Sequence, residues 1–239
     1  MTKLKKICLF SIFLFSILGL ICQSVQATES ITSDTLLKVI SGIGPTAPLD
    51  PLNPQPNQPI IPEQGQPTGS DGSLAIDYIS NFQFGTQSIS SKNKTYYAQA
   101  QKYQNADGQP TSGPNFIQIT DVRGTWAGWK VSVKQNVQFK YGEKELKNAE
   151  LSMTGGEMVS YNNQTSTPDV VETVTLRNIG YEYEIITASE NQGMGTWIYR
   201  FGSDTENGSK AVQLSVPGSS VKYTGKYITK LTWVLKDTP

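Results

Sequence analysis

Apolar and polar residues alternate with a period of two along most of the chain after residue 73. The clearest runs are 74–78, 129–134, 197–201 and 212–216, in which every second side chain is apolar. Such alternation predicts half-buried β-strands, and turn dipeptides such as Asn207-Gly208 separate the runs. No segment after residue 73 keeps a 3.6-residue pattern for three turns. We therefore expect an all-β domain over residues 73–239, either an antiparallel β-sandwich or a barrel-like fold.

The chain before residue 73 has a different composition. Eight prolines fall between residues 45 and 67. Proline fixes φ, lacks an amide donor and biases the preceding residue towards an extended backbone. We therefore expect residues 28–72 to be a short N-terminal segment and a Pro-rich linker that stays outside the core as a semi-rigid spacer.

Residues 1–27 have the features of a cleaved export signal. Three lysines within the first six residues precede an apolar run over residues 7–22, and Val25-Gln26-Ala27 follows as a small-x-small cleavage site. An uncleaved membrane anchor and a lipid anchor on Cys22 are the alternatives. The apolar run is shorter than the roughly 20 residues that a membrane-spanning helix needs. These features predict a secreted protein.

The composition excludes several classes of chemistry. The sequence has no histidine, and both of its cysteines, Cys8 and Cys22, lie in the predicted signal. Ser-His-Asp and Cys-His catalysis is therefore impossible, and ordinary zinc sites are excluded. The 20 basic and 20 acidic side chains balance, which is not the basic footprint of a nucleic-acid-binding protein. We expect no enzyme activity, no cofactor and no metal.

Two pairs of acidic residues have a functional and a structural interpretation. Asp204 and Glu206 either form a loose calcium site or flank a hairpin turn, and the turn is favoured because an EF-hand pattern is missing. Glu182 and Glu184 either imitate a glycosidase pair or are surface groups of an ordinary strand. We favour the structural interpretation for both pairs.

The last predicted strand carries the most specific motif. It reads Tyr-x-x-x-Leu-Thr-Trp-x-Leu and ends near a terminal proline, with the motif positions Tyr227, Leu231, Trp233, Leu235 and Pro239. A second Trp-x-Val segment is formed by Trp129 and Val131. Together with the opening segment 72–85 and the Pro-rich stretch, these motifs resemble the WxL domain, a C-terminal surface-attachment domain of low-GC Gram-positive bacteria. The resemblance covers about residues 45–239, and the proximal motif departs from the family by having Val131 where Leu is usual.

The resemblance implies non-covalent attachment to the cell wall, with peptidoglycan or an associated wall polymer as the ligand. It also implies other WxL proteins and a membrane-anchored surface protein as partners. We find no LPxTG sorting signal and no second apolar segment, so we expect no membrane span in the mature chain. The alternative function is an adhesin or a structural subunit of a multi-protein surface complex that acts mainly through protein contacts.

Two interpretations remain for the side chains of the motif strands. The tryptophans are either core residues that share a face with Val and Leu, which we favour, or exposed platforms for sugar rings. On the opposite strand faces, lysines either contact an anionic wall polymer or simply discourage pairing of sheet edges. We favour the second alternative for this set, which comprises Lys130, Lys134, Lys226, Lys230 and Lys236.

Overall fold

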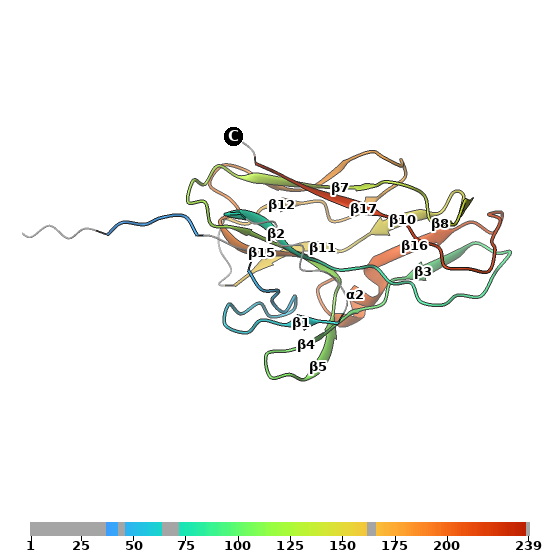
Figure 1. The fold of residues 1–239 in the computed structure, drawn as a ribbon, viewed down its shortest axis with the longest axis horizontal. Helices are drawn as coiled ribbons and strands as arrows, with labels where there is room; N and C mark the ends of the chain where they lie inside the picture. Colours follow the sequence, from blue (N-terminus) through green and yellow to red (C-terminus); the bar gives the residue numbers. More distant parts are fainter. Residues whose placement is uncertain (1–36, 43–45, 64–71, 162–165, 238–239) are drawn as a thin grey trace, which may run out of the picture. The chain divides into compact units, whose positions relative to one another are not determined.

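The computed structural model describes residues 37–42, 46–63, 72–161 and 166–237. The chain divides into two units, Met1–Val39 and Ile40–Pro239, and the fold below is that of the second unit (Figure 1). The predicted signal, residues 1–27, lies outside the described residues. Within the described part of the chain, no helix is both long and apolar enough to cross a membrane.

Three four-stranded antiparallel sheets make up most of the domain. In spatial order, the first sheet contains β12 (Asp169–Val170), β14 (Tyr183–Ala188), β7 (Trp129–Gln135) and β17 (Leu231–Asp237). The second contains β11 (Gly156–Ser160), β15 (Gly195–Phe201), β6 (Phe116–Asp121) and β2 (Leu74–Ile79). The third contains β13 (Val174–Thr175), β10 (Glu150–Met153), β16 (Val212–Val216) and β3 (Lys94–Tyr97). The expected all-β antiparallel fold is confirmed.

Two smaller sheets contain the remaining strands. One contains β1 (Ile61–Pro62), β4 (Gln101–Gln104) and β5 (Pro110–Gly113), and the other is the hairpin of β8 (Lys140–Tyr141) and β9 (Lys144–Glu145). The three large sheets share one core, because alternate side chains of each point inward. Its members include Trp129 of the first sheet, Ile119 and Trp197 of the second, and Leu151 and Leu214 of the third. Each such side chain contributes about 1.5–3 kcal/mol when it is fully buried.

The described part of the Pro-rich segment, residues 46–63, packs against this domain, contrary to the expectation of an unpacked spacer. Leu49 and Ile60 are 3% and 4% exposed, and β1 pairs with β4. Leu49 and Ile60 belong to a second apolar cluster. Its other members include Tyr78, Phe116 and Ile198, which lie on the other face of the second sheet. The segment bends at residues 51–53 and turns at residues 56–57, and its apolar residues supply the burial that holds it in place.

Hydrogen bonds from buried polar groups also hold the same segment on the domain. The Asp77 carboxylate accepts hydrogen bonds from the Thr46 amide at 3.0 Å and from Thr120 Oγ1 at 2.6 Å. Gln118, fully buried, accepts from the Leu49 amide at 2.8 Å. All six residues of β6 are therefore buried, because the core covers one face and the N-terminal segment the other. This explains why the sequence of β6 does not alternate strictly.

Three local expectations are corrected by the structure. Residues 204–208 are not a hairpin turn, because α2 (Thr205–Ala211) begins there with Asp204 as its N-cap. The Asp204 carboxylate accepts from the Asn207 amide at 2.8 Å, which is a capping role. The apolar residues over 170–186 predict one long strand or a pair, whereas the structure has parts of β12, β13 and β14 there. The last strand begins at Leu231 and not at Tyr227.

Candidate functional site

The two motif strands lie side by side. β7 and β17 pair in antiparallel register, with Trp233 opposite Val133 and Leu235 opposite Val131 (Figure 1). Directly opposed residues share a face of the sheet, so Trp233 and Leu235 point towards the same core as Trp129. The motifs are about 100 residues apart in the chain, and strand pairing joins them into one element.

Trp129 is a core residue. Its side chain is 0% exposed, and its Nε1 donates to the Gly193 carbonyl at 3.0 Å. A side chain at Gly193 would collide with this indole, since an added Cβ would lie 2.5 Å from Trp129 Nε1. Trp233 is half-buried because β17 is the edge strand of its sheet, yet it packs on the same cluster. The geometry therefore gives the motif tryptophans a packing role.

The remaining motif positions have separate places. Val131 is fully buried, and Leu231 and Leu235 are half-buried against the core. Tyr227 precedes β17, packs partly against the core and uses its hydroxyl to accept from the Tyr223 amide at 2.9 Å. Pro239 lies outside the described residues.

The lysines of the two motif strands face outward, as the alternation predicts, but two of them are neutralised. Lys130 and Lys236 are opposite each other across β7 and β17. Lys130 pairs with Glu184 at 3.1 Å, and Lys236 pairs with Glu182. Hydrogen bonds from Thr187 and Lys130 lower the pKa of Glu184, and the hydrogen bond from Lys236 lowers that of Glu182. These acids are charged partners of lysines on a strand face.

Lys226 and Lys230 lie elsewhere, on a surface that sequence reasoning did not assemble. Residues 222–230 run beside the β8–β9 hairpin, and the backbones of Lys140 and Ile228 exchange hydrogen bonds of 3.0 Å and 2.9 Å. We call residues 140–147 and 222–230 the basic–aromatic platform. The two segments contain six lysines and two glutamates, which leaves four positive charges in a chain whose formal net charge is zero.

The aromatic rings of the platform are exposed and fixed. Tyr141 and Tyr223 are 43% and 45% exposed. The Tyr141 ring lies 6.3 Å from that of Tyr227 and covers Gly225, where an added Cβ would come within 2.7 Å of it. Lys144 Nζ lies 3.9 Å from the centre of the Tyr223 ring, within cation–π range. Exposed rings beside free ammonium groups form a surface that suits an anionic polymer with apolar ring faces.

Most lysines of the platform remain available to a ligand. Lys222 is an exception, because its Nζ donates to the carbonyls of Pro217, Gly218 and Ser220 and holds that turn. Lys226 and Lys230 are exposed, and among the described residues neither forms an ion pair. The repeated Lys-Tyr pairs at 140–141 and 222–223 were the sequence signal that could have identified the platform.

Trp126 is a second feature that the sequence pattern did not single out. It is 42% exposed and lies between β6 and β7 with φ of 57°. A bulky side chain in this left-handed region costs of order 1–3 kcal/mol, and such residues cluster at functional sites. The preceding Arg123 makes a bidentate contact with the buried Asp121, at 2.8 Å and 3.0 Å, and also pairs with Asp237 of β17.

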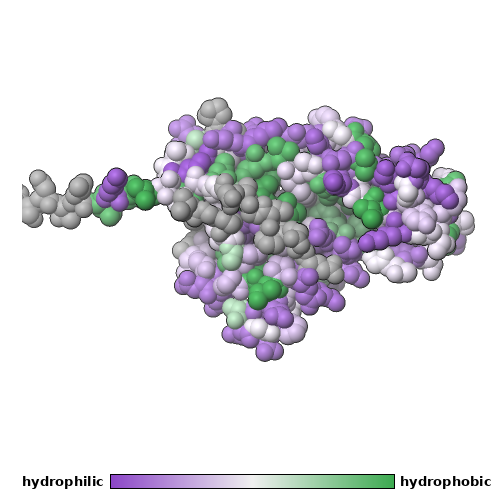
Figure 2. Space-filling view, in the orientation of Figure 1, coloured by the Kyte–Doolittle hydropathy of each residue, from purple (hydrophilic) through white to green (hydrophobic). Residues whose placement is uncertain are grey.

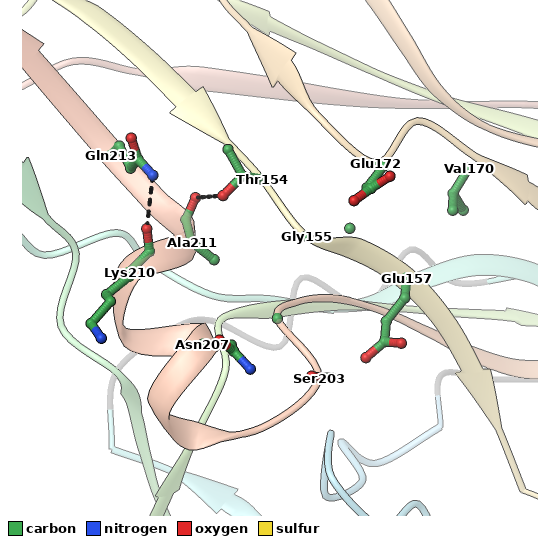
Figure 3. Close-up of a pocket in the computed structure, with 12 residues that line it drawn as sticks. Thr154, Gly155, Glu157, Val170, Glu172, Ser203, Asn207, Lys210, Ala211 and Gln213 are labelled. Carbon is green, nitrogen blue, oxygen red and sulfur yellow. Dashed lines mark hydrogen bonds between the residues drawn. The ribbon is translucent and has the colours of Figure 1, made fainter.

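A polar cleft of about 670 Å³ opens where the chain crosses from β10 to β11. Figure 3 shows Glu157 and Glu172 on one side of Gly155, with Asn207 of α2 across the cleft. Glu157 already pairs with Arg200 at 2.7 Å. Among the described residues, no aromatic ring that could stack on a sugar lines the cleft. No cluster of three or more metal-ligating side chains occurs in the part of the chain that the structure describes.

An apolar seam lies where the edge strands β2 and β17 meet. The two strands are in contact, and each carries apolar residues that are half-buried against the core, namely Leu74 and Ile79 of β2 and Leu231, Trp233 and Leu235 of β17. Figure 2 shows apolar residues at the surface of this face, bordered by hydrophilic ones. Two sheet edges with apolar side chains between them are suited to contact with another protein.

Comparison with known proteins identifies the family. A family model described as WxL domain surface cell wall-binding matches residues 26–239. No curated protein and no solved structure matches the chain. The match includes the Pro-rich segment, which agrees with its packing on the domain. The chain belongs to the WxL domain family of surface cell wall-binding proteins.

Proposed function

We propose that this protein attaches non-covalently to the cell wall by binding peptidoglycan, or a polymer associated with it, through the basic–aromatic platform. The family is one of surface cell wall-binding domains, and the platform supplies a chemistry that such a ligand needs. The observation that carries the proposal is the concentration of four net positive charges around exposed tyrosines in a chain without net charge.

The chemistry of the ligand fits this surface. Wall polymers carry carboxylates or phosphates beside sugar rings, whose apolar faces stack on aromatic side chains. Lys226 and Lys230 are exposed for the anionic groups and Tyr141 for the sugar rings, while Lys144 lies over the exposed Tyr223 ring. Attraction between exposed charges is screened over about 8 Å at physiological ionic strength, so binding should weaken as salt is added.

Charge reversal on the platform tests the proposal. In a pull-down of the mature protein on purified sacculi, a variant with Lys226→Glu and Lys230→Glu should lose at least about tenfold in affinity, equivalent to about 1.4 kcal/mol. The matched control carries Lys38→Glu and Lys102→Glu, two exposed lysines outside the platform, and changes the net charge equally. Equal binding of both variants, or binding that survives high salt and denaturants, would contradict the proposal.

Binding without catalysis is part of the same proposal. A general acid requires a raised pKa. The two acids considered as a catalytic pair, Glu182 and Glu184, have lowered pKa values because lysines and Thr187 donate to them. Absence of any soluble product after long incubation with sacculi would agree with this; release of sugar or peptide fragments would contradict it.

Assembly with other surface proteins is the second candidate function, and the apolar seam between β2 and β17 favours it. Other WxL proteins and a membrane-anchored surface protein are the proposed partners. Leu74→Lys, at the half-buried margin of the seam, should abolish co-purification of such a partner without affecting binding to sacculi. Unchanged co-purification would exclude the seam as the contact.

A further inference from the structure

The indole of Trp126 faces solvent, unlike the other tryptophans of the chain. Trp129 and Trp197 are 0% and 1% exposed, and Trp233 packs on the core from the edge strand. Trp126 is 42% exposed and lies in the loop of residues 122–128, which we call the Trp126 loop. This placement leaves a large aromatic face available to a ligand.

The Trp126 loop is fixed on both sides of the indole. On one side, the Asn191 amide donates to the Trp126 carbonyl at 2.9 Å. On the other, Arg123 Nη2 donates to the Gly128 carbonyl at 2.8 Å. Gly128 adopts φ of 82° so close to the next loop that an added Cβ would lie 2.2 Å from the Ala188 carbonyl oxygen. A ring presented from a fixed backbone loses little conformational entropy when it binds.

The backbone conformation disfavours an indole at this position. The backbone of Trp126 has φ of 57°, a conformation that glycine and asparagine adopt far more readily than tryptophan. The ring is only partly buried, so the strain is set against less burial than a core tryptophan such as Trp129 supplies. Contact with a ligand is a role that accounts for both the exposure and the residue type.

The surroundings of the indole indicate the ligand class. The loop brings Thr125 to the surface, and the neighbouring loop contacts it through Asn191, which is flanked in the chain by Glu190 and by Gln192, whose Oε1 accepts from the Ser189 amide at 2.8 Å. These side chains offer hydroxyl, amide and carboxylate groups, which hydrogen-bond to sugar hydroxyls. Arg123, the cation of this loop, is held by Asp121 and Asp237. The surface is thus neutral to acidic, unlike the basic–aromatic platform.

We propose that Trp126 is a stacking platform for the pyranose ring of a neutral glycan and forms a second wall contact, separate from the basic–aromatic platform. The two surfaces lie beyond opposite ends of β7, because the Trp126 loop precedes this strand and β8 follows it (Figure 1). The inference rests on the proposed wall-binding function but on different residues. Two separated contacts on one domain would raise the affinity for a polymer above that of either contact.

A soluble uncharged glycan, the tetrasaccharide of β-1,4-linked N-acetylglucosamine, is the probe. Wild-type protein should bind it with a dissociation constant of about 1 mM, seen as a saturable shift of one indole N–H resonance. Trp126→Asn should weaken binding at least about tenfold, whereas Trp126→Phe should keep part of it. Trp126→Asn should keep a cooperative thermal melt, because asparagine adopts a positive φ readily and relief of the strain offsets the loss of partial burial.

Two outcomes overturn the inference: no binding by wild-type protein at about ten times the expected constant, and equal binding by wild type and Trp126→Asn. The charge-reversed platform variant, Lys226→Glu with Lys230→Glu, should bind the tetrasaccharide like wild type. If that variant binds sacculi normally while Trp126→Asn still loses the tetrasaccharide, the platform proposal fails and the Trp126 contact stands. Loss of tetrasaccharide binding in the platform variant would instead contradict a separate second contact.

Discussion

Gln118 is the side chain whose loss should release the Pro-rich segment from the domain. Its Oε1 accepts from the Leu49 amide at 2.8 Å. Its Nε2 lies 3.1 Å from the Ala47 carbonyl, 3.3 Å from the Thr46 carbonyl and 3.0 Å from Asp77 Oδ2. Gln118→Leu keeps a side chain of similar size but removes both the acceptor and the donors.

The magnitude follows from the groups that lose partners. A buried Leu49 amide without an acceptor costs about 1–3 kcal/mol, and the lost bond to the Asp77 carboxylate about 1.5–3 kcal/mol. The total loss of stability has an upper limit, because residues 46–62 can detach from the domain and return these groups to water. Detachment forfeits the burial of Leu49 and Ile60, about 1.5–3 kcal/mol each. We expect a loss of about 3 kcal/mol, most of it as local opening of the segment.

Hydrogen exchange measures this opening directly. The wild-type amides of Leu49 and Ile60 are bonded to Gln118 Oε1 and the Pro48 carbonyl, respectively. In Gln118→Leu both should exchange about 100-fold faster, while amides of β7 stay protected. Gln109→Leu, at an exposed position of the β4–β5 turn, is the matched control. Unchanged protection of Leu49 in Gln118→Leu would refute the reasoning.

Further predictions concern the motif tryptophans and a buried acid. In denaturant melts, Trp129→Ala should lower the free energy of unfolding by about 3–5 kcal/mol. Trp233→Ala should lower it by roughly half as much, because Trp233 is only half-buried at the sheet edge. Equal losses would contradict this difference in packing. Burial raises the pKa of Asp77 above 3.8, so the folded state binds this proton more tightly than the unfolded state. That stability is complete below pH 3.8 and is lost as the pH rises through the raised folded pKa. The stability of wild type relative to Asp77→Asn should therefore fall as the pH rises above 3.8, and a rise would contradict the reasoning.

The strands and their faces were predictable from alternation, because the side-chain period of a strand is a local property. Trp129 and Val131 lie on the core face and Lys130 on the solvent face, as expected. The helix α2 was missed because seven residues are too few for a helical period, and Asn207-Gly208 is equally typical of a turn. The capping role of Asp204 was the available signal.

The packing of the Pro-rich segment was not predictable from its own composition. Proline content determines the local backbone, but docking depends on a matching surface. That surface is built by Asp77 and Gln118, which the pairing of β2 and β6 brings together. The strand β6, buried on both faces, was the indirect signal, since its apolar residues do not alternate strictly.

The sequence by itself determined the fold class, the family motifs and the faces on which the motif residues lie. The tertiary structure decided which strands are neighbours and therefore which groups surround each lysine. Lys130 and Lys236 are neutralised by Glu184 of β14 and by Glu182 just before it, whereas Lys226 and Lys230 lie in the segment beside the β8–β9 hairpin, near exposed tyrosines. The physical reason is that alternation sets the direction of a side chain, while the charge around it depends on residues that are distant in the chain.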